Sequence, residues 1–233
     1  MAYAADVDTK PWNAYYERPA TLSLLPKLDG VVVLDAGCGS GWYSEQFLSQ
    51  GATVTAVDFN QEFVSLTKSR VGSRARVLQA NLAGRLKFAS DGEFDLIVSP
   101  LVMHYIRDWQ PVFSEFRRIL KPEGLLVFST HHPFMDWKYF NRENYFATEL
   151  LEDDWGIGKL QFYRRPLTNI SADLQAAGFV IERLLEPEPK PEFQRALPEA
   201  YKRLVLNPQF LVIRARANFL AQAGEPTVSA AAS

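Results

Sequence analysis

Aliphatic runs alternate with stretches of helical periodicity along most of the chain. Strands covered on both faces are continuously apolar, whereas an amphipathic helix repeats its apolar residues about every 3.6 positions. On this basis strands are expected at residues 31–34, 52–58, 75–80, 94–99, 124–130, 179–185 and 209–217. Helices are expected at residues 42–50, 61–71, 109–120 and 169–177. The alternation predicts an α/β fold with a doubly wound, mostly parallel sheet.

The alternation stops after residue 130. Residues 131–165 mix aromatic with charged side chains and show no clean period. They form either a cover that packs on the sheet or an aromatic lid over a flat or apolar substrate. Residues 186–207 begin with proline and glutamate and leave room for a short helix. We see no internal repeat, so residues 1–221 are expected to form one domain and the small, polar residues 222–233 a disordered tail.

Composition and charge are those of a soluble globular protein. Of the 233 residues, 47% are hydrophobic and 22% are charged, with a net charge of −2. This balance gives no basic footprint for nucleic acid, and the pair Arg164-Arg165 is interpreted as a solvated face or a contact for a small anion. Neither a membrane span nor a secretory signal is expected, since long apolar runs are missing. A single cysteine excludes an internal disulfide and fits a cytoplasmic location.

The first predicted strand runs into a glycine-rich turn, Asp35-Ala36-Gly37-Cys38-Gly39-Ser40-Gly41. Glycines permit positive φ and a close approach of backbone to ligand, and the next helix points free N–H groups toward the turn. The dinucleotide fingerprint is G-x-G-x-x-G, with a pyrophosphate at that helix. Here the spacing is G-x-G-x-G after an acid. Asp35 is a poor neighbour for a pyrophosphate and a good one for an ammonium or a sulfonium.

Polar residues end the first four predicted strands, namely Asp35, Asp58, Asn81 and Ser99. Ligands of open α/β sheets bind outside the carboxyl ends of the strands, so these side chains are expected at the rim of one site. An acid at the end of the second strand can accept hydrogen bonds from both hydroxyls of a ribose. The alternative for Asp58 is to cap the following helix.

The glycine-rich turn resembles motif I of the class I S-adenosylmethionine-dependent methyltransferases, of the small-molecule, methyltransferase-11-like type. The resemblance extends over residues 12–217. It implies a seven-stranded Rossmann-like sheet whose last strand is antiparallel. It also implies S-adenosyl-L-methionine as the cofactor and S-adenosyl-L-homocysteine as the product. Gly37 and Gly39 would approach the methionine portion near Asp35. Ser99 and its neighbours would close the other side of the site for the methionine portion.

The same resemblance assigns the nucleoside portion to the next two strand ends. Asp58 would bind the ribose hydroxyls, and Phe59 would pack on the adenine. Asn81 would meet the adenine amino group, with the backbone N–H of Leu82 on the ring. An aspartate is usual at position 81, but the amide oxygen of asparagine also accepts a hydrogen bond from an amino group.

Residues 1–28 are similar to the short cap that members of this family fold over the cofactor. Tyr16 would then lie near the sulfonium, and Arg18 would pair with the methionine carboxylate. The alternative is an interface helix that only packs against the sheet.

Histidines are the candidates for a general base. His104 follows the fourth predicted strand, where family members contact substrate or cofactor; the alternative is a histidine bonded to nearby backbone. His131 and His132 follow the fifth strand. Neighbours on an extended chain point opposite ways, so at most one of the two faces a pocket. No metal site is expected, because too few ligands converge.

These features favour a methyltransferase (EC 2.1.1.-) that acts on a small-molecule acceptor, without a nucleic-acid or membrane partner, as a monomer or a homodimer. Two alternatives stay open. One is a protein that binds the cofactor without catalysis. The other is a nicotinamide-dependent oxidoreductase, which the missing G-x-x-G turn disfavours. The sequence does not indicate whether oxygen, nitrogen, carbon or sulfur accepts the methyl group.

Overall fold

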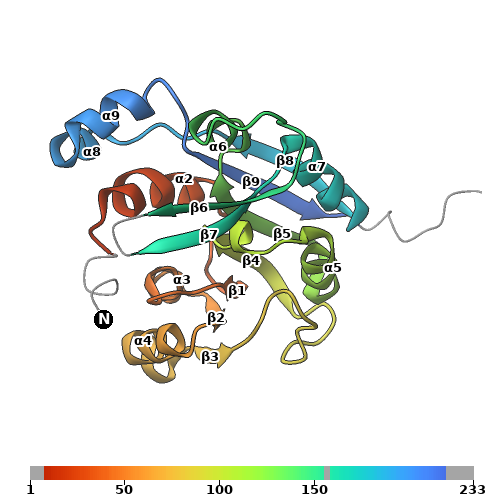
Figure 1. Ribbon diagram of the computed structural model, residues 1–233. Coiled ribbons are helices and arrows are strands. Elements are labelled where there is room, and N and C mark those ends of the chain that lie inside the picture. The colour runs from red at the N-terminus through yellow and green to blue at the C-terminus, as the bar shows by residue number, and fades with distance from the viewer. Residues whose placement is uncertain (1–7, 155–157, 219–233) are drawn as a thin grey trace, which may run out of the picture.

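In the computed structural model, which describes residues 8–154 and 158–218, seven strands form one sheet in the order β3-β2-β1-β4-β5-β9-β8 (Figure 1). Their bounds are β1 Val32–Ala36, β2 Thr53–Asp58, β3 Arg76–Gln79, β4 Phe94–Pro100, β5 Leu120–His131, β8 Phe179–Leu185 and β9 Phe210–Ala217. Strand β9 is antiparallel to both of its neighbours, and the remaining pairs are parallel. The predicted sheet, with its last strand antiparallel, is confirmed.

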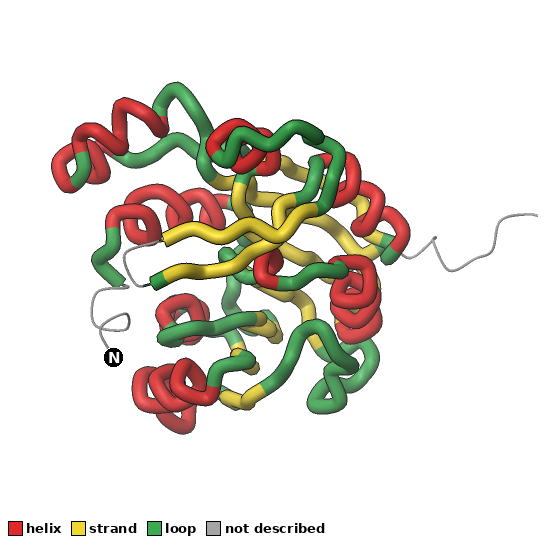
Figure 2. The backbone as a smooth tube through the Cα atoms, in the orientation of Figure 1, coloured by secondary structure: helices red, strands yellow, loops and turns green. Residues whose placement is uncertain are grey.

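Helices cover both faces of this sheet (Figure 2). One face carries α2 (Arg18–Ser23), α3 (Trp42–Ser49) and α4 (Gln61–Val71). The other carries α5 (Trp109–Ile119) and α7 (Leu167–Ala176). The connections place the amino ends of these helices near the carboxyl ends of the strands, which is where a ligand site forms in such folds.

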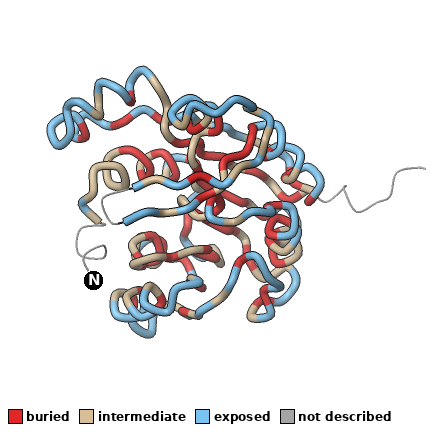
Figure 3. Tube along the Cα trace, viewed as in Figure 1, coloured by how far each residue is buried: buried red, intermediate tan, exposed pale blue. Residues whose placement is uncertain are grey.

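Alternating side chains of the central strands build two cores, one on each face of the sheet. In β1, Val33 packs with the residues of α3 and α4, whereas its neighbour Leu34 packs with those of α5. Successive strand residues point to opposite faces, so a strand covered on both sides must be apolar throughout. Figure 3 shows that the buried part of the chain is concentrated in these strands.

Strand β5 begins earlier than the sequence predicted. Helix α5 ends before Pro122 as expected, but Leu120 already pairs with Phe94 of β4, and the register then shifts. Glu123 adopts a φ of 62° within this irregular start. The proline cannot donate to a ladder of hydrogen bonds, and a local register shift accommodates it.

The segment without a clear period folds into helix α6 (Pro133–Tyr139) and an antiparallel hairpin of β6 (Glu149–Asp154) and β7 (Lys159–Arg164). Acidic residues fill most of β6, which removes the alternation that marks a strand, so the sequence did not predict the hairpin. The hairpin packs over the short helix η3 (Met103–Tyr105), beyond the end of β4 (Figure 1).

Smaller elements complete the described chain. Helices α8 (Pro191–Ala196) and α9 (Pro198–Leu204) occupy the region expected to hold one short helix. A π-helical turn, η1 (Asn13–Glu17), precedes α2, and a 3₁₀ turn, η2 (Gly72–Arg74), follows α4. Within the described ranges no helix is long and apolar enough to cross a membrane. The expected tail, residues 222–233, lies outside the described residues.

We expect Phe113→Ala to lower the free energy of unfolding by about 3–5 kcal/mol, because it would leave a cavity in a well-packed core. Phe113 is fully buried and packs against Phe128 and Phe179. Phe59→Ala is the matched control, since Phe59 is 71% exposed. Denaturant melts measure both variants. Similar losses in the two would contradict this assignment of the core.

Candidate functional site

The backbone of the glycine-rich turn is fixed to the end of β2. The N–H groups of Gly37 and Cys38 both donate to the Val57 carbonyl, at 2.8 and 2.9 Å. The Gly39 N–H donates to a carboxylate oxygen of Asp58 at 2.9 Å. These three N–H groups are therefore used within the protein, which leaves the turn poorly suited to bind a phosphate through its amides.

Gly37 and Gly39 are required for different reasons. Gly37 has a φ of 88°, and a Cβ there would stand 2.2 Å from a methyl carbon of Val102, so a side chain does not fit. Gly39 has a φ of 54°, and a Cβ there would have no heavy atom within 4 Å. The backbone at Gly39 is therefore open to a ligand.

Asp35 is a buried carboxylate at the end of β1 with only one oxygen in use. Ser44 of α3 donates to its Oδ2 at 2.5 Å, whereas Oδ1 has no hydrogen-bond partner among the described residues. Burial is the main cause that raises the pKa of Asp35 to about 7, and the nearby Asp58 carboxylate adds to it. An unsatisfied buried acceptor costs about 1–3 kcal/mol, so Oδ1 is suited to receive a donor or a cation from a ligand.

Asp58 stands at the end of β2, beside the glycine-rich turn. Its Oδ2 accepts from Gly39, and its Oδ1 accepts from the N–H of Asn60 at 2.8 Å. Burial raises the pKa of the Asp58 carboxyl. The alternative role as a helix cap is wrong, because the side chain of Asn60 caps α4 by accepting from Glu62. Phe59 projects from the same strand end with an exposed ring.

The remaining strand ends have local roles as well. Asn81 is exposed, and its amide oxygen accepts from the N–H of Ala83 at 3.0 Å, which closes a turn after β3. The neighbouring Leu82 is buried in the α5 core. Ser99 is fully buried and donates to the carbonyl of Ala36 at 2.9 Å, so its hydroxyl joins the ends of β1 and β4.

Tyr16 and Arg18 lie on the N-terminal segment but in different surroundings. The Tyr16 hydroxyl accepts from the N–H of Gln209 at 2.8 Å, and its ring packs with Phe210. Arg18 stacks on the ring of Trp42 at 4.1 Å, at the start of α3 and next to the glycine-rich turn. The segment therefore bridges β9 and the turn.

Glu17 is a central residue that the sequence analysis missed. It is almost fully buried and accepts from the hydroxyls of Thr21 at 2.6 Å, Ser129 at 2.6 Å and Tyr43 at 2.9 Å. Burial raises the pKa of its carboxyl. Two of these partners are 26 and 112 positions away in the chain, so no local pattern could have indicated the cluster.

The two candidate histidines meet at the carboxyl ends of β4 and β5, with His104 on η3 just after β4 and His131 as the last residue of β5. The rings of His104 and His131 stack with their centroids 4.3 Å apart, and Phe162 of β7 packs against His131 at 4.7 Å. Burial, with contributions from His131 and Arg165, holds the pKa of His104 well below its ordinary value. His104 is therefore neutral at physiological pH.

His132 points away from this pair. Its Nδ1 accepts from the N–H of Met135 and caps α6, and its Nε2 lies 2.6 Å from a carboxylate oxygen of Glu186. His131 lines a small hollow at this end of the sheet, whereas His132 is not among its lining residues.

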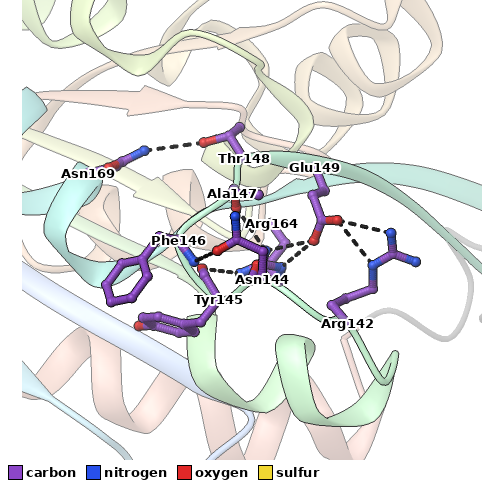
Figure 4. Close-up of polar contacts among 9 residues, drawn as sticks. All are labelled: Arg142, Asn144, Tyr145, Phe146, Ala147, Thr148, Glu149, Arg164 and Asn169. Carbon is purple, nitrogen blue, oxygen red and sulfur yellow. Dashed lines mark hydrogen bonds and ion pairs between the residues drawn. The ribbon is translucent and has the colours of Figure 1, made fainter.

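Arg164 fixes the loop between α6 and β6 over this end of the sheet (Figure 4). Its side chain is fully buried and donates to the carbonyls of Asn144, Tyr145 and Ala147, at 2.8–2.9 Å. It also pairs with Glu149 at 2.7 Å. Arg164 and Arg165 are both buried, so the interpretation of this pair as a solvated face is wrong.

Comparison with known proteins agrees with this geometry. Residues 34–128 match the family model of a methyltransferase domain. A structure of an S-adenosylmethionine-dependent methyltransferase from Mesorhizobium loti is 26% identical, with a TM-score of 0.76 over 90% of this chain and 99% of its own. These two matches support a class I S-adenosylmethionine-dependent methyltransferase. A solved protein from Listeria monocytogenes, 24% identical, shares the fold, with a TM-score of 0.78 over 87% of this chain and 96% of its own.

Curated relatives match this chain over different lengths. An uncharacterised protein of Haemophilus influenzae is 28% identical over 227 residues, which cover 88% of each chain. A malonyl-[acyl-carrier protein] O-methyltransferase of Buchnera aphidicola is 37% identical over 117 residues, which cover 49% of this chain and 46% of its own. The match to this named enzyme therefore spans less than half of its length.

We expect Asp35→Asn to change how stability depends on pH. The folded carboxyl keeps its proton up to about pH 7, whereas an unfolded aspartate releases it near pH ~4. Folding therefore binds a proton between these values, and this residue's contribution to stability falls as pH rises through that window. Relative to the wild type, Asp35→Asn should gain stability from pH 4 to pH 8, on the order of a few kcal/mol.

Denaturant melts of the ligand-free protein at several pH values measure this difference. Asp91→Asn is the control for the loss of an exposed carboxylate, one that pairs with Arg118 at the surface. A stability difference between wild type and Asp35→Asn that stays constant with pH would show that Asp35 is ionised throughout.

Proposed function

We propose that this protein transfers a methyl group from S-adenosylmethionine to a small-molecule acceptor. The observation that carries the proposal is the unpartnered, buried Oδ1 of Asp35 at the end of β1, where the chain enters the turn that holds the open backbone of Gly39. Such a site suits the ammonium end of an amino-acid-like ligand, whose charge would favour the ionised carboxylate. When bound, S-adenosylmethionine supplies a methyl group already activated on a sulfonium.

Asp58 and Phe59 are suited to hold the nucleoside. Backbone N–H groups orient the Asp58 carboxylate, which keeps further lone pairs for the two ribose hydroxyls. The exposed ring of Phe59 offers a face for the adenine. Asn81 and the N–H of Leu82 would contact the edge of the adenine, as the family resemblance implies.

The methionine end would lie along the glycine-rich turn. Gly37 and Gly39 bring backbone close to it, and Ser99 supports the turn from behind through the Ala36 carbonyl. Arg18, beside Trp42, would pair with the methionine carboxylate. Tyr16, held by β9, would set the position of this segment and exclude water from the reacting centre.

His104 and His131 are the candidates to accept a proton from the acceptor. A neutral imidazole can act as a general base, and the pKa of His104 lies low enough to keep its ring neutral. The rest of the catalytic effect would come from positioning, because the sulfonium needs no further activation.

The alternative of a nicotinamide-dependent oxidoreductase is less well supported. A dinucleotide pyrophosphate needs amide donors in the turn, but here the N–H groups of Gly37, Cys38 and Gly39 already donate to β2. A cofactor-binding protein without catalysis stays open as the second candidate. The named relatives include an O-methyltransferase and a thiol S-methyltransferase, so they do not favour one acceptor atom. A cytoplasmic location and a monomer or homodimer stay predictions.

Calorimetry with S-adenosylmethionine and with NADH tests the cofactor, and turnover of methyl-labelled S-adenosylmethionine against a metabolite panel tests catalysis. Binding of NADH alone would overturn the proposal. Binding of S-adenosylmethionine without turnover of any acceptor would favour the non-catalytic alternative.

Asp58→Ala should weaken S-adenosylmethionine binding by about 2–4 kcal/mol, because two charge-assisted hydrogen bonds to the ribose would be lost. Calorimetry measures the affinity, and a thermal melt shows whether the glycine-rich turn survives the loss of its Asp58 contact. Asp91→Ala, which removes an exposed aspartate, is the control. An affinity for S-adenosylmethionine that is unchanged in Asp58→Ala would show that Asp58 does not bind the ribose.

His104→Asn should lower kcat by about 100-fold with an acceptor that the wild type methylates, as expected when a general base is removed. Affinity for S-adenosylmethionine should stay within about twofold of the wild type if only the base is affected. His132→Asn, outside the pair, is the matched control and should keep its kcat. A kcat for His104→Asn equal to that of the control would return His104 to a packing role.

A further inference from the structure

A cavity of about 570 Å³ lies between the start of α5, the β6–β7 hairpin and α7, away from the glycine-rich turn. Pockets for small molecules commonly measure about 300–1,000 Å³, so this one is large enough for a ligand. Its wall carries four charged side chains, namely Arg107, Asp108, Arg165 and Asp173. None of these residues belongs to the proposed cofactor site.

Arg165 is the most deeply buried charge of this wall. It is 95% buried, and its guanidinium stacks on Trp109 at 3.9 Å. Its Nη2 donates to the carbonyls of Ile106 and Arg107, at 2.8 and 3.1 Å. Its Nε is buried and has no hydrogen-bond partner in the described part of the chain. The guanidinium thus retains unused donors.

The adjacent arginine shows what a fully used guanidinium looks like in this protein. The guanidinium of Arg164 donates hydrogen bonds to three backbone carbonyls and to the carboxylate of Glu149 (Figure 4). Arg165 contacts no carboxylate: across the described ranges no ion pair within 4.0 Å joins it to Asp108 or Asp173. A buried cation with no carboxylate in contact is costly, so an anionic group from a ligand that reached the guanidinium would be stabilised here.

The two aspartates of the wall favour a ligand that also carries a positive charge. Asp108 and Asp173 lie close enough to interact electrostatically with Arg165 but beyond ion-pair distance. Burial raises the pKa of Asp173, while Arg165 opposes this shift. A simple anion would be attracted by Arg165 and the more exposed Arg107 and repelled by the two aspartates. A ligand with one carboxylate and one ammonium group would complement both.

A second, much smaller hollow of about 10 Å³ lies next to this wall. Trp109, Tyr163 and Arg165 line both the cavity and the hollow, and Thr130 and His131 also line the hollow. The residues that would fix a charged ligand are therefore neighbours of those that would receive its proton.

We infer that this cavity holds the charged end of the methyl acceptor and that the acceptor is a small zwitterion with a carboxylate on Arg165 and an ammonium group facing Asp108 and Asp173. This inference rests on the proposed function. It names a substrate class, amino acids and related aminated acids, and makes Arg165 a residue that determines specificity.

Calorimetry on the full chain saturated with S-adenosylhomocysteine tests the inference. The probes are the twenty common amino acids and, for each that binds, its carboxamide and its N-acetyl derivative. We expect at least one amino acid to bind. Its carboxamide, which lacks the carboxylate, and its N-acetyl derivative, which lacks the ammonium group, should each bind at least tenfold more weakly. Equal binding of the carboxamide or of the N-acetyl derivative, or no binding by any amino acid, would overturn the zwitterion.

Two variants test whether the amino acid binds in the cavity. Arg165→Gln should weaken the affinity for the amino acid at least tenfold and leave the affinity for S-adenosylhomocysteine within twofold of the wild type. Arg203→Gln, which removes an arginine stacked on Trp12 outside the cavity, is the matched control and should bind as the wild type does. Equal affinities in the two variants would overturn the site, and thermal melts check that both are folded.

Turnover separates this inference from the proposed function. The amino acid that binds best should accept labelled methyl from S-adenosylmethionine, and binding without methylation would overturn its role as acceptor. If S-adenosylmethionine itself fails to bind, the proposed function fails. The amino-acid titration without cofactor then still reports on the cavity.

Discussion

Two carboxylates with no paired cation lie at the ends of β1 and β2, and the site is built around them. Asp35 is fully buried, Asp58 partly so, and within the described residues no ion pair within 4.0 Å involves either group. Each is held by donors of the protein, a hydroxyl for Asp35 and backbone N–H groups for Asp58. Folding therefore brings together two carboxyl groups whose pKa values are raised by burial, and a positively charged ligand would favour their ionised forms.

The sequence predicted this part of the molecule well because its signals are local. Aliphatic runs fixed the strands, and the ends of those runs placed Asp35, Asp58 and Ser99 at one edge of the sheet. The spacing of the glycines was also informative, since Gly37 leaves no room for a side chain. Parallel strands bring their carboxyl ends to one edge without any need to know the loops.

The parts that the sequence could not predict depend on contacts between distant residues. Glu17 is explained by Tyr43 and Ser129, and nothing in its own segment distinguishes it from a surface glutamate. Arg164 and Arg165 are adjacent in sequence, yet one fixes a loop and the other faces a cavity. Neighbours at a strand end point to opposite sides, so their environments differ although their chemistry is the same.

The cluster around Glu17 also has a consequence for kinetics. It joins the N-terminal segment to α3 and β5 through hydroxyl donors, each within 2.9 Å. Lifting the segment would break the bonds from Tyr43 and Ser129 and expose two apolar rings, Tyr16 and Phe193, to water. The segment is therefore held closed by specific hydrogen bonds and by apolar packing, and it does not swing freely. If the proposed cofactor binds beneath this segment, these hydrogen bonds would have to break before it could leave, and opening of the segment would then limit the rate of exchange.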